Sequence, residues 1–420
     1  MQSRKESNLK NVVVVGASGA GASLARDLAK KLPSDHRIVL IDANEFAYYA
    51  IAGLRAAVVP GWENKIFKPL DSFFGPAHQT RHIVLTKTKV IKLSERSLWV
   101  DVENESKGFG TEIAFDYCVL ALGSIYGAPM RSLSGSIEEG KDHLRGLQDQ
   151  IKAARQIVLI GGGSVGIEFA GEIASQYPKE KSVTIVHRNP QLLSKSVPAK
   201  LAAKLHWQLE AAGIHVVLGT EVDSNIVESG RGRVDLGGGK IIDADLIFNT
   251  TGTKTNTSLI AAADANVLDP NGLVKVDAHL RIVPSLDGGF FDGKTYFAIG
   301  DCAASLGPQT YFKAKNDATF AAKNILASIF KKSLTAIKAP LDVIVVPIGT
   351  TGGAGKVPFG IVGAWPTSLI KGKGLFISNF NSLYLYSAST IVSTIMPILA
   401  VTVVITAWWS YHHVGLGRAT

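Results

Sequence analysis

The chain has very few cysteines, and this scarcity excludes several kinds of chemistry. Only Cys118 and Cys302 occur in 420 residues, and no Cys-x-x-Cys motif is present. Two cysteines so far apart in the sequence give no disulfide framework and no zinc site, so we predict no bound metal. This usage is typical of a protein in a reducing compartment.

The sequence also lacks clustered basic charge and N-terminal targeting signals. Lysine and arginine number 44 against 35 acidic residues, which gives a formal charge of +9. The cations are scattered, so the pattern favours a solvated surface over a nucleic-acid groove. Residues 1–8 have no apolar signal core, and residue 2 is not the glycine that N-myristoylation needs.

Charge is absent from one long segment near the C-terminus. No Asp, Glu, Lys or Arg occurs between Lys373 and Arg418. A helix over 386–411 would be long enough to cross a bilayer at about 1.5 Å per residue, with Trp408 near the interface. The alternative is a buried or dimer-interface helix. We expect a membrane tail anchor, with the rest of the chain facing the cytoplasm.

What the chain does contain is two glycine-rich turns. Residues 16–21 read Gly-Ala-Ser-Gly-Ala-Gly, and residues 161–166 read Gly-Gly-Gly-Ser-Val-Gly. Each turn follows an apolar run and precedes a predicted helix. In a βαβ dinucleotide unit the missing side chains let a pyrophosphate approach the helix N-terminus. We therefore predict two dinucleotide sites, an arrangement typical of proteins that move electrons between two cofactors.

The spacing after the two turns is the same. The interval from Gly16 to Asp42 equals that from Gly161 to His187, and both end a second apolar run. This position meets the adenosine ribose, so Asp42 is predicted to contact it, although a strand-end Asp can also form a simple turn. His187 and Arg188 stand where an NADH-selective unit has a carboxylate that repels a 2′-phosphate. We predict that NADPH is tolerated and even preferred, unless Arg188 points to solvent.

A whole module is repeated along the chain. Residues 84–102 and 219–245 both predict β-meanders. Runs 116–123 and 244–252 both predict a buried strand that ends in a turn of small residues. This repeat argues for duplicated dinucleotide domains.

Further motifs carry a resemblance to a known superfamily. Residues 52–57 read Ala-Gly-Leu-Arg-Ala-Ala, residues 167–172 read Ile-Glu-Phe-Ala-Gly-Glu, residues 299–303 read Ile-Gly-Asp-Cys-Ala, and residues 369–376 read Leu-Ile-Lys-Gly-Lys-Gly-Leu-Phe. With the two turns, these motifs resemble the two-dinucleotide-binding-domain flavoproteins of the pyridine nucleotide-disulfide oxidoreductase superfamily. The narrower resemblance is to the branch of apoptosis-inducing-factor-like and ferroptosis suppressor proteins, related to type II NADH:quinone oxidoreductases.

The resemblance implies an α/β fold with two Rossmann-like FAD/NAD(P)-binding domains of three-layer ββα architecture. A small C-terminal α+β segment and a C-terminal hydrophobic helix complete it. The expected divisions are a FAD-binding domain in two parts, 9–127 and 256–335, an NAD(P)H-binding domain, 128–255, the α+β segment, 336–385, and a hydrophobic membrane tail, 386–411.

The resemblance also implies FAD and NAD(P)H as cofactors and assigns their contacts. The FAD contacts would be Gly16, Ser18, Gly19, Ala20, Gly21, Asp42, Arg55, Val90 and Asp301. The NAD(P)H contacts would be Gly161, Gly163, Gly166, His187 and Arg188. Ser18 departs from the family pattern, which has a glycine there, and we expect it to shift the pyrophosphate slightly.

Three residues are assigned catalytic roles by the same resemblance. Glu168, near the start of the second predicted helix, would position the nicotinamide or assist proton transfer, or else only complement the helix dipole. Lys371 and Phe376 would border the flavin and acceptor pocket. Their alternatives are a basic residue near a membrane surface and an apolar contact holding the tail.

The resemblance and the missing cysteine pair together predict the reaction. Hydride would pass from NAD(P)H to FAD, and electrons would then pass to a lipophilic quinone such as ubiquinone. Thioredoxin- and glutathione-reductase chemistry is excluded. The glutamine pair of type II NADH dehydrogenases is not matched, because the chain reads Tyr311-Phe-Lys-Ala-Lys-Asn316 there. The alternatives are a redox-gated death effector that binds DNA and a membrane-tethered scaffold with a structural FAD.

Overall fold

The computed structural model describes residues 9–385, apart from 77, 79, 128, 130–134, 224–229 and 237. The hydrophobic helix expected over 386–411 lies outside these residues. Across the described part of the chain, no helix combines the length and apolar character that crossing a membrane requires.

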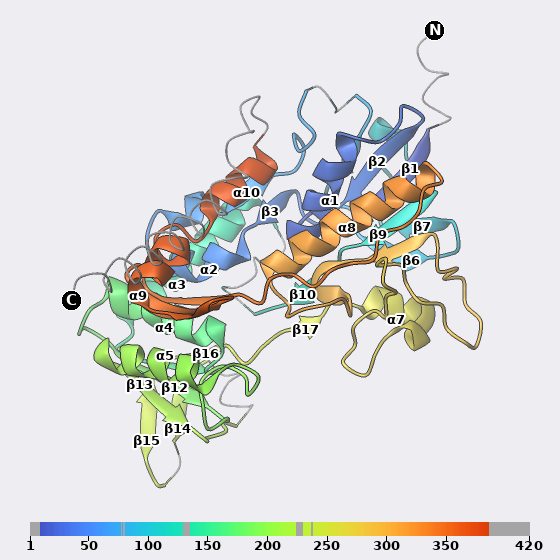
Figure 1. The fold of residues 1–420 in the computed structure, drawn as a ribbon. Coiled ribbons are helices and arrows are strands. Elements are labelled where there is room, and N and C mark those ends of the chain that lie inside the picture. The colour runs from blue at the N-terminus through green and yellow to red at the C-terminus, as the bar shows by residue number, and fades with distance from the viewer. Residues whose placement is uncertain are drawn as a thin grey trace, which may run out of the picture.

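A five-stranded parallel sheet organises the first unit (Figure 1). Its order is β18-β9-β1-β2-β5, and valines of β1 alternate between two separate cores, Val12 and Val14 on one face and Val13 and Val15 on the other. This period of two is what a strand buried on both faces requires. The strands are β1 (Lys10–Val15), β2 (His36–Ile41), β5 (Ile83–Leu85), β9 (Tyr117–Leu120) and β18 (Tyr296–Ala298).

Helices cover one face of this sheet and a smaller sheet covers the other. Helices α1 (Gly19–Ala29) and α8 (Tyr311–Ile329) pack together on the first face (Figure 1). The antiparallel sheet β6 (Val90–Leu93), β7 (Ser97–Val100) and β8 (Glu112–Ala114) shares the second core. This is the expected three-layer ββα arrangement, and β6 and β7 form the meander predicted within 84–102.

The second unit repeats the plan with four parallel strands in the order β13-β12-β11-β16. The strands are β11 (Gln156–Ile160), β12 (Ser182–His187), β13 (Ile214–Leu218) and β16 (Leu246–Asn249). Helices α4 (Ser164–Gln176) and α5 (Ala199–Ala211) pack on the sheet, and the hairpin β14 (Gly232–Asp235) and β15 (Ile241–Ala244) shares a core with its other face. The repeated module predicted from the sequence is therefore confirmed.

The C-terminal segment contributes an antiparallel sheet and short helices that reach both units. It contains β19 (Ile344–Ile348), β20 (Gly352–Val357), β21 (Gly360–Val362), α9 (Ala364–Thr367), a π-helical turn (Ser368–Gly372) and α10 (Ile377–Tyr384). Strand β19 packs on α4 of the second unit, and α10 contacts α1 of the first.

The remaining elements complete the described chain. These are β3 (Phe46–Tyr48), α2 (Gly53–Ala56), β4 (Phe67–Pro69), β10 (Ser124–Ile125), α3 (Ile137–Ala153), β17 (Lys254–Thr255), α7 (Ser258–Asp264) and 3₁₀ turns at Ala50–Ala52, Trp62–Asn64, Glu105–Lys107, Ala265–Val267 and Gly300–Cys302. The chain passes from the first unit to the second and later returns. The two connecting segments pair with each other through the antiparallel strands β10 and β17. The domain boundaries themselves stay a prediction.

Candidate functional site

The first glycine turn joins β1 to α1 and has room only for glycine at two positions. Gly16 has φ +102°, and a Cβ there would lie 2.3 Å from the carbonyl oxygen of Ala121. A Cβ on Gly21 would lie 1.8 Å from the carbonyl oxygen of Gly16. The helix therefore starts directly against the strand end, which is the geometry that brings backbone N–H groups to a pyrophosphate.

Asp42 connects the end of β2 to this turn. Its Oδ2 accepts a hydrogen bond from the Ala17 N–H at 2.7 Å, and its Oδ1 accepts from the Asn44 N–H at 2.9 Å. Asp42 thus shapes a local turn and also lines the cavity in front of the glycines, while its contact with the adenosine ribose stays a prediction. A carboxylate at this place can accept from ribose hydroxyls.

A cavity of about 490 Å³ opens in front of the first turn, beside the carboxyl ends of the parallel strands. Ligands of doubly wound sheets bind in this position. Seven of the nine residues assigned to FAD line it, namely Gly16, Ser18, Gly19, Ala20, Asp42, Val90 and Asp301. The other two lie elsewhere: Gly21 packs behind the turn, and Arg55 is buried against Glu172.

Asp301 also lines this cavity, from the turn that follows β18. Its Oδ2 accepts from the Ser124 hydroxyl at 2.9 Å, and its carbonyl oxygen accepts from the Gln309 side chain at 3.1 Å. The turn that carries it passes through Gly300, whose φ is +75°. A carboxylate fixed in this way can receive hydrogen bonds from the hydroxyl groups of a ribityl chain.

Among the tyrosines that line the cavity, Tyr49 and Tyr384 form hydrogen bonds that no sequence signal marked. The Tyr384 hydroxyl donates to the carbonyl oxygen of Ala17 at 2.7 Å, and the Tyr49 hydroxyl donates to that of Leu375 at 2.9 Å. Burial raises the pKa of both phenols, so they stay neutral donors. The first bond fastens α10 to the first glycine turn, and the second fastens the segment before α10 to the residue that follows β3.

The second glycine turn repeats the design between β11 and α4. Gly161 has φ +120°, and a Cβ there would lie 2.7 Å from the carbonyl oxygen of Thr250. A Cβ on Gly166 would lie 2.0 Å from the carbonyl oxygen of Gly161. The Thr250 hydroxyl donates to the carbonyl oxygen of Gly161 at 2.9 Å. Gly163 is the N-cap residue of α4 and has open space around it.

His187 and Arg188 lie at the end of β12, beside the second turn. A ring nitrogen of His187 lies 3.4 Å from the carbonyl oxygen of Leu193, and burial lowers the pKa of the imidazole. Arg188 is exposed. The strand end that would carry an acidic residue in an NADH-selective unit therefore presents a neutral ring and a cation.

Two ion pairs join both units to the C-terminal segment. Lys371 Nζ donates to Glu168 Oε1 at 2.6 Å, and Arg55 makes a two-pronged contact with Glu172 at 2.6 and 2.7 Å. Arg55 also donates to the carbonyl oxygen of Gly372 at 2.7 Å. Burial raises the pKa of Glu168, and the Lys371 ammonium partly opposes this. The pairs hold α2, α4 and the π-helical turn together.

Phe376 lies next to this junction. It adopts a left-handed backbone conformation with φ +55°, and its ring packs edge-to-face on Phe312 with centroids 5.8 Å apart. Of the three residues assigned catalytic roles, the structure brings Glu168 and Lys371 into direct contact. None of the three is among the residues lining the cavity at the first turn.

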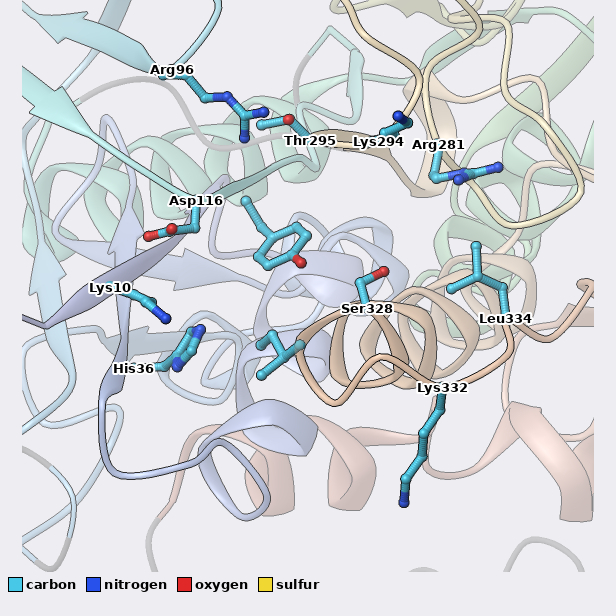
Figure 2. A pocket seen from close by; sticks show the side chains of 12 residues that line it. Lys10, His36, Arg96, Asp116, Arg281, Lys294, Thr295, Ser328, Lys332 and Leu334 are labelled. Atoms are coloured by element: carbon cyan, nitrogen blue, oxygen red, sulfur yellow. The ribbon is translucent and has the colours of Figure 1, made fainter.

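A second cavity of about 490 Å³ lies at the other edge of the first sheet, where its strands begin (Figure 2). Figure 2 shows basic side chains from separate strands and loops around it, with Lys332 directed away from the others. The three ion pairs at its wall are Lys10–Asp35, Arg96–Asp292 and Arg281–Asp277, with N···O distances of 3.5, 3.3 and 2.6 Å. Paired cations without a glycine turn give no comparable dinucleotide site.

The fold and the two glycine turns together define an oxidoreductase class with two dinucleotide sites. A family model described as pyridine nucleotide-disulphide oxidoreductase matches residues 10–318, and the chain belongs to this family. The family binds FAD and NAD(P)H.

Named relatives agree with this assignment. The chain is 34% identical to Fe-regulated protein 8 of Mycosarcoma maydis, over 79% of this chain and 83% of that protein. It is 30% identical to Oxidoreductase ptaL of Pestalotiopsis fici, over 83% and 91%. It is 28% identical to Ferroptosis suppressor protein 1 of Homo sapiens, over 89% and 95%.

Solved structures support the fold. A NAD-dependent persulfide reductase from A. fulgidus aligns with TM-score 0.65 and 20% identity, over 83% of this chain and 63% of that one. An engineered water-forming NADPH oxidase aligns with TM-score 0.62 and 18% identity, over 83% and 75%. The chain thus spans under two thirds of the persulfide reductase. At these identities the likeness concerns the fold alone.

Proposed function

We propose that the chain is an FAD-dependent NAD(P)H:quinone oxidoreductase. The observation that carries this is the state of its two cysteines. Cys302 Sγ donates weakly to the carbonyl oxygens of Leu120 and Ile299, and Cys118 is fully buried. Burial raises the pKa of both thiols, which keeps them unreactive. With no thiol available as a relay, a bound FAD would have to pass its electrons to an external acceptor.

When bound, FAD supplies the two-electron chemistry, and the chain's own residues arrange its surroundings. The first turn, Asp42 and Asp301 would hold its pyrophosphate and sugar parts, and the second turn would hold the nicotinamide cofactor. Glu168, on the helix that starts at the second turn, pairs with Lys371 of the π-helical turn. We assign this pair the positioning of the nicotinamide, because it fixes α4 against the C-terminal segment.

The charge-free sequence that follows α10 favours a lipophilic acceptor. Phe380, Leu383 and Tyr384 of α10 line the first cavity, and the charge-free sequence 386–411 follows within two residues of this helix. A tail anchored in a membrane would bring the cavity close to the phase in which a quinone dissolves. We therefore propose a tail anchor, with the folded units on its cytoplasmic side and ubiquinone as the representative acceptor.

The nicotinamide preference is proposed from the end of β12. His187 is neutral there and Arg188 is exposed, so no carboxylate repels a 2′-phosphate. NADPH should serve at least as well as NADH.

The test is oxidation of NADH and NADPH by purified, FAD-loaded protein in detergent, with and without a short-chain ubiquinone. Strong stimulation by the quinone supports the proposal. Reduction of the flavin without stimulation would mean that the acceptor is wrong. A flavin that neither nucleotide reduces would favour a scaffold with a structural FAD and would overturn the enzyme assignment.

A further inference from the structure

A lysine and an aspartate are buried together on α8, just below the FAD cavity. The side chains of Lys313 and Asp317 are 1% and 0% exposed, and Lys313 Nζ lies 3.2 Å from Asp317 Oδ2. They stand one helical turn apart on the same face. Lys313 lies in the segment 311–316, where the glutamine pair is not matched, but the sequence assigns no role to either residue.

This pair bonds both of the peptide groups that flank Gly300 in the flavin site. Asp317 Oδ2 accepts from the Gly300 N–H at 3.0 Å, and Lys313 Nζ donates to the Gly300 carbonyl oxygen at 2.9 Å. Lys313 Nζ also lies 3.3 Å from the carbonyl oxygen of Ala303, and Ser305 donates to Asp317 Oδ2 at 2.7 Å. The ion pair therefore spans the turn that carries Asp301 into the cavity.

The pair is poorly suited to a purely stabilising role. Lys313 lies in the first turn of α8, where the helix dipole disfavours a cation. Asp317 Oδ1 is buried with no hydrogen-bond partner among the described residues. Apolar side chains of similar volume often replace a buried ion pair without loss of stability. The arrangement instead supplies an acceptor for the N–H and a donor for the carbonyl oxygen of Gly300, which has a left-handed backbone conformation.

We propose that Lys313 and Asp317 are positioning residues for FAD. They fix the two peptide groups that flank Gly300, so that Asp301 meets the ribityl and pyrophosphate part of the cofactor. The pair acts through the turn and does not line the cavity. This inference rests on FAD binding alone, so it is independent of the nicotinamide and the quinone in the proposed function.

The experiment titrates deflavinated, full-length protein with FAD and follows the quenching of flavin fluorescence. Lys313→Met with Asp317→Leu removes both contacts to Gly300 without leaving a buried charge. We expect its FAD dissociation constant to rise about tenfold, which corresponds to about 1.4 kcal/mol. Lys313→Met with Asp317→Asn keeps an acceptor for the Gly300 N–H, so it should recover part of the lost affinity.

The matched control is Asn324→Leu on the same helix. Asn324 is also fully buried, but it bonds the backbone of His279 and Thr335, away from the cavity. It should lower the melting temperature and leave FAD affinity unchanged. Wild-type affinity in the Met/Leu variant would overturn the proposal, and so would an equal loss in Asn324→Leu. If the Met/Leu variant does not fold, the FAD dissociation constant of the Met/Asn variant is compared with those of wild type and Asn324→Leu, and the same two results would overturn the proposal.

Discussion

The two glycine turns share one backbone design and differ at the residue that stands at the end of the following strand. In both, the last glycine abuts the carbonyl of the first, so that an added Cβ would lie 1.8 or 2.0 Å from that oxygen. In the first unit the carboxylate of Asp42 bonds the turn itself. In the second unit the imidazole of His187 faces Leu193 instead. In the proposed function, the shared backbone would hold a pyrophosphate in each unit, and the strand end would influence which nucleotide binds.

The surroundings of the two turns differ as well. The first has a cavity of about 490 Å³ walled by residues from both parts of its domain and from α10. The helix that follows the second turn carries Glu168 and Glu172, which bind the C-terminal segment and the first unit. The first turn therefore borders a cavity. The helix after the second turn is instead joined by ion pairs to the C-terminal segment and to the first unit.

The largest effects should come from alanine at the last glycine of each turn. Because the new Cβ would overlap a carbonyl oxygen, Gly21→Ala should raise the FAD dissociation constant by about a thousandfold. Gly166→Ala should leave FAD bound and slow flavin reduction by NAD(P)H by a similar factor. FAD content by absorbance and rapid-mixing reduction separate the two.

Gly146→Ala provides the control for these variants, because it places a methyl group in open space within α3. It should behave like wild type. If Gly166→Ala lost FAD while Gly21→Ala kept it, the assignment of the two turns would be reversed.

The next effect concerns the pair that ties the second unit to the C-terminal segment. Lys371→Met leaves the Glu168 carboxylate buried alone and should lower the free energy of unfolding by about 3 kcal/mol near neutral pH. Because burial raises the pKa of Glu168 in the folded state, its ionisation reduces stability as pH rises through that pKa. Below the ordinary glutamate pKa of 4.5 it is protonated in both states, and the loss should shrink.

Denaturation of wild type and Lys371→Met from acid to neutral pH measures this difference. Adding Glu168→Gln removes the isolated charge and should restore much of the stability at neutral pH. A loss that is equal at every pH, or that persists in the double variant, would contradict the coupling of Glu168 with Lys371.

The smallest effect is on nucleotide choice. His187→Asp places a carboxylate at the end of β12, as Asp42 does at the end of β2. It should lower kcat/KM for NADPH relative to NADH by about tenfold, because the carboxylate would repel the 2′-phosphate. Burial lowers the pKa of His187, so the wild-type preference should change little above pH 7. Arg188→Ala, assayed alongside, measures how much of the preference comes from the cation. An unchanged ratio in both variants would place the 2′-phosphate elsewhere.

The sequence predicts the features that depend on local pattern. The two turns, the matched interval to Asp42 and His187, and the paired meanders all follow from periodicity and glycine placement, and the structure confirms these elements. The family resemblance assigns FAD contacts to nine residues, and seven of these line the cavity.

The contacts that local pattern cannot supply are those between distant segments. Arg55 was expected along FAD, yet its guanidinium is taken up by Glu172, 117 positions away. The link from Lys371 to Glu168 spans 203 positions, and that from Tyr384 to Ala17 spans 367. Each depends on where the C-terminal segment packs, which no periodicity in the sequence specifies.

The central claim is that electrons enter through the nicotinamide site, reach FAD and leave for a quinone. An anaerobic titration of the FAD-loaded protein tests it most directly. One equivalent of NADPH should bleach the flavin absorbance, and one equivalent of a short-chain ubiquinone should then restore it. A flavin that NADPH and NADH both leave oxidised, or a reduced flavin that the quinone fails to reoxidise without oxygen, would contradict the account.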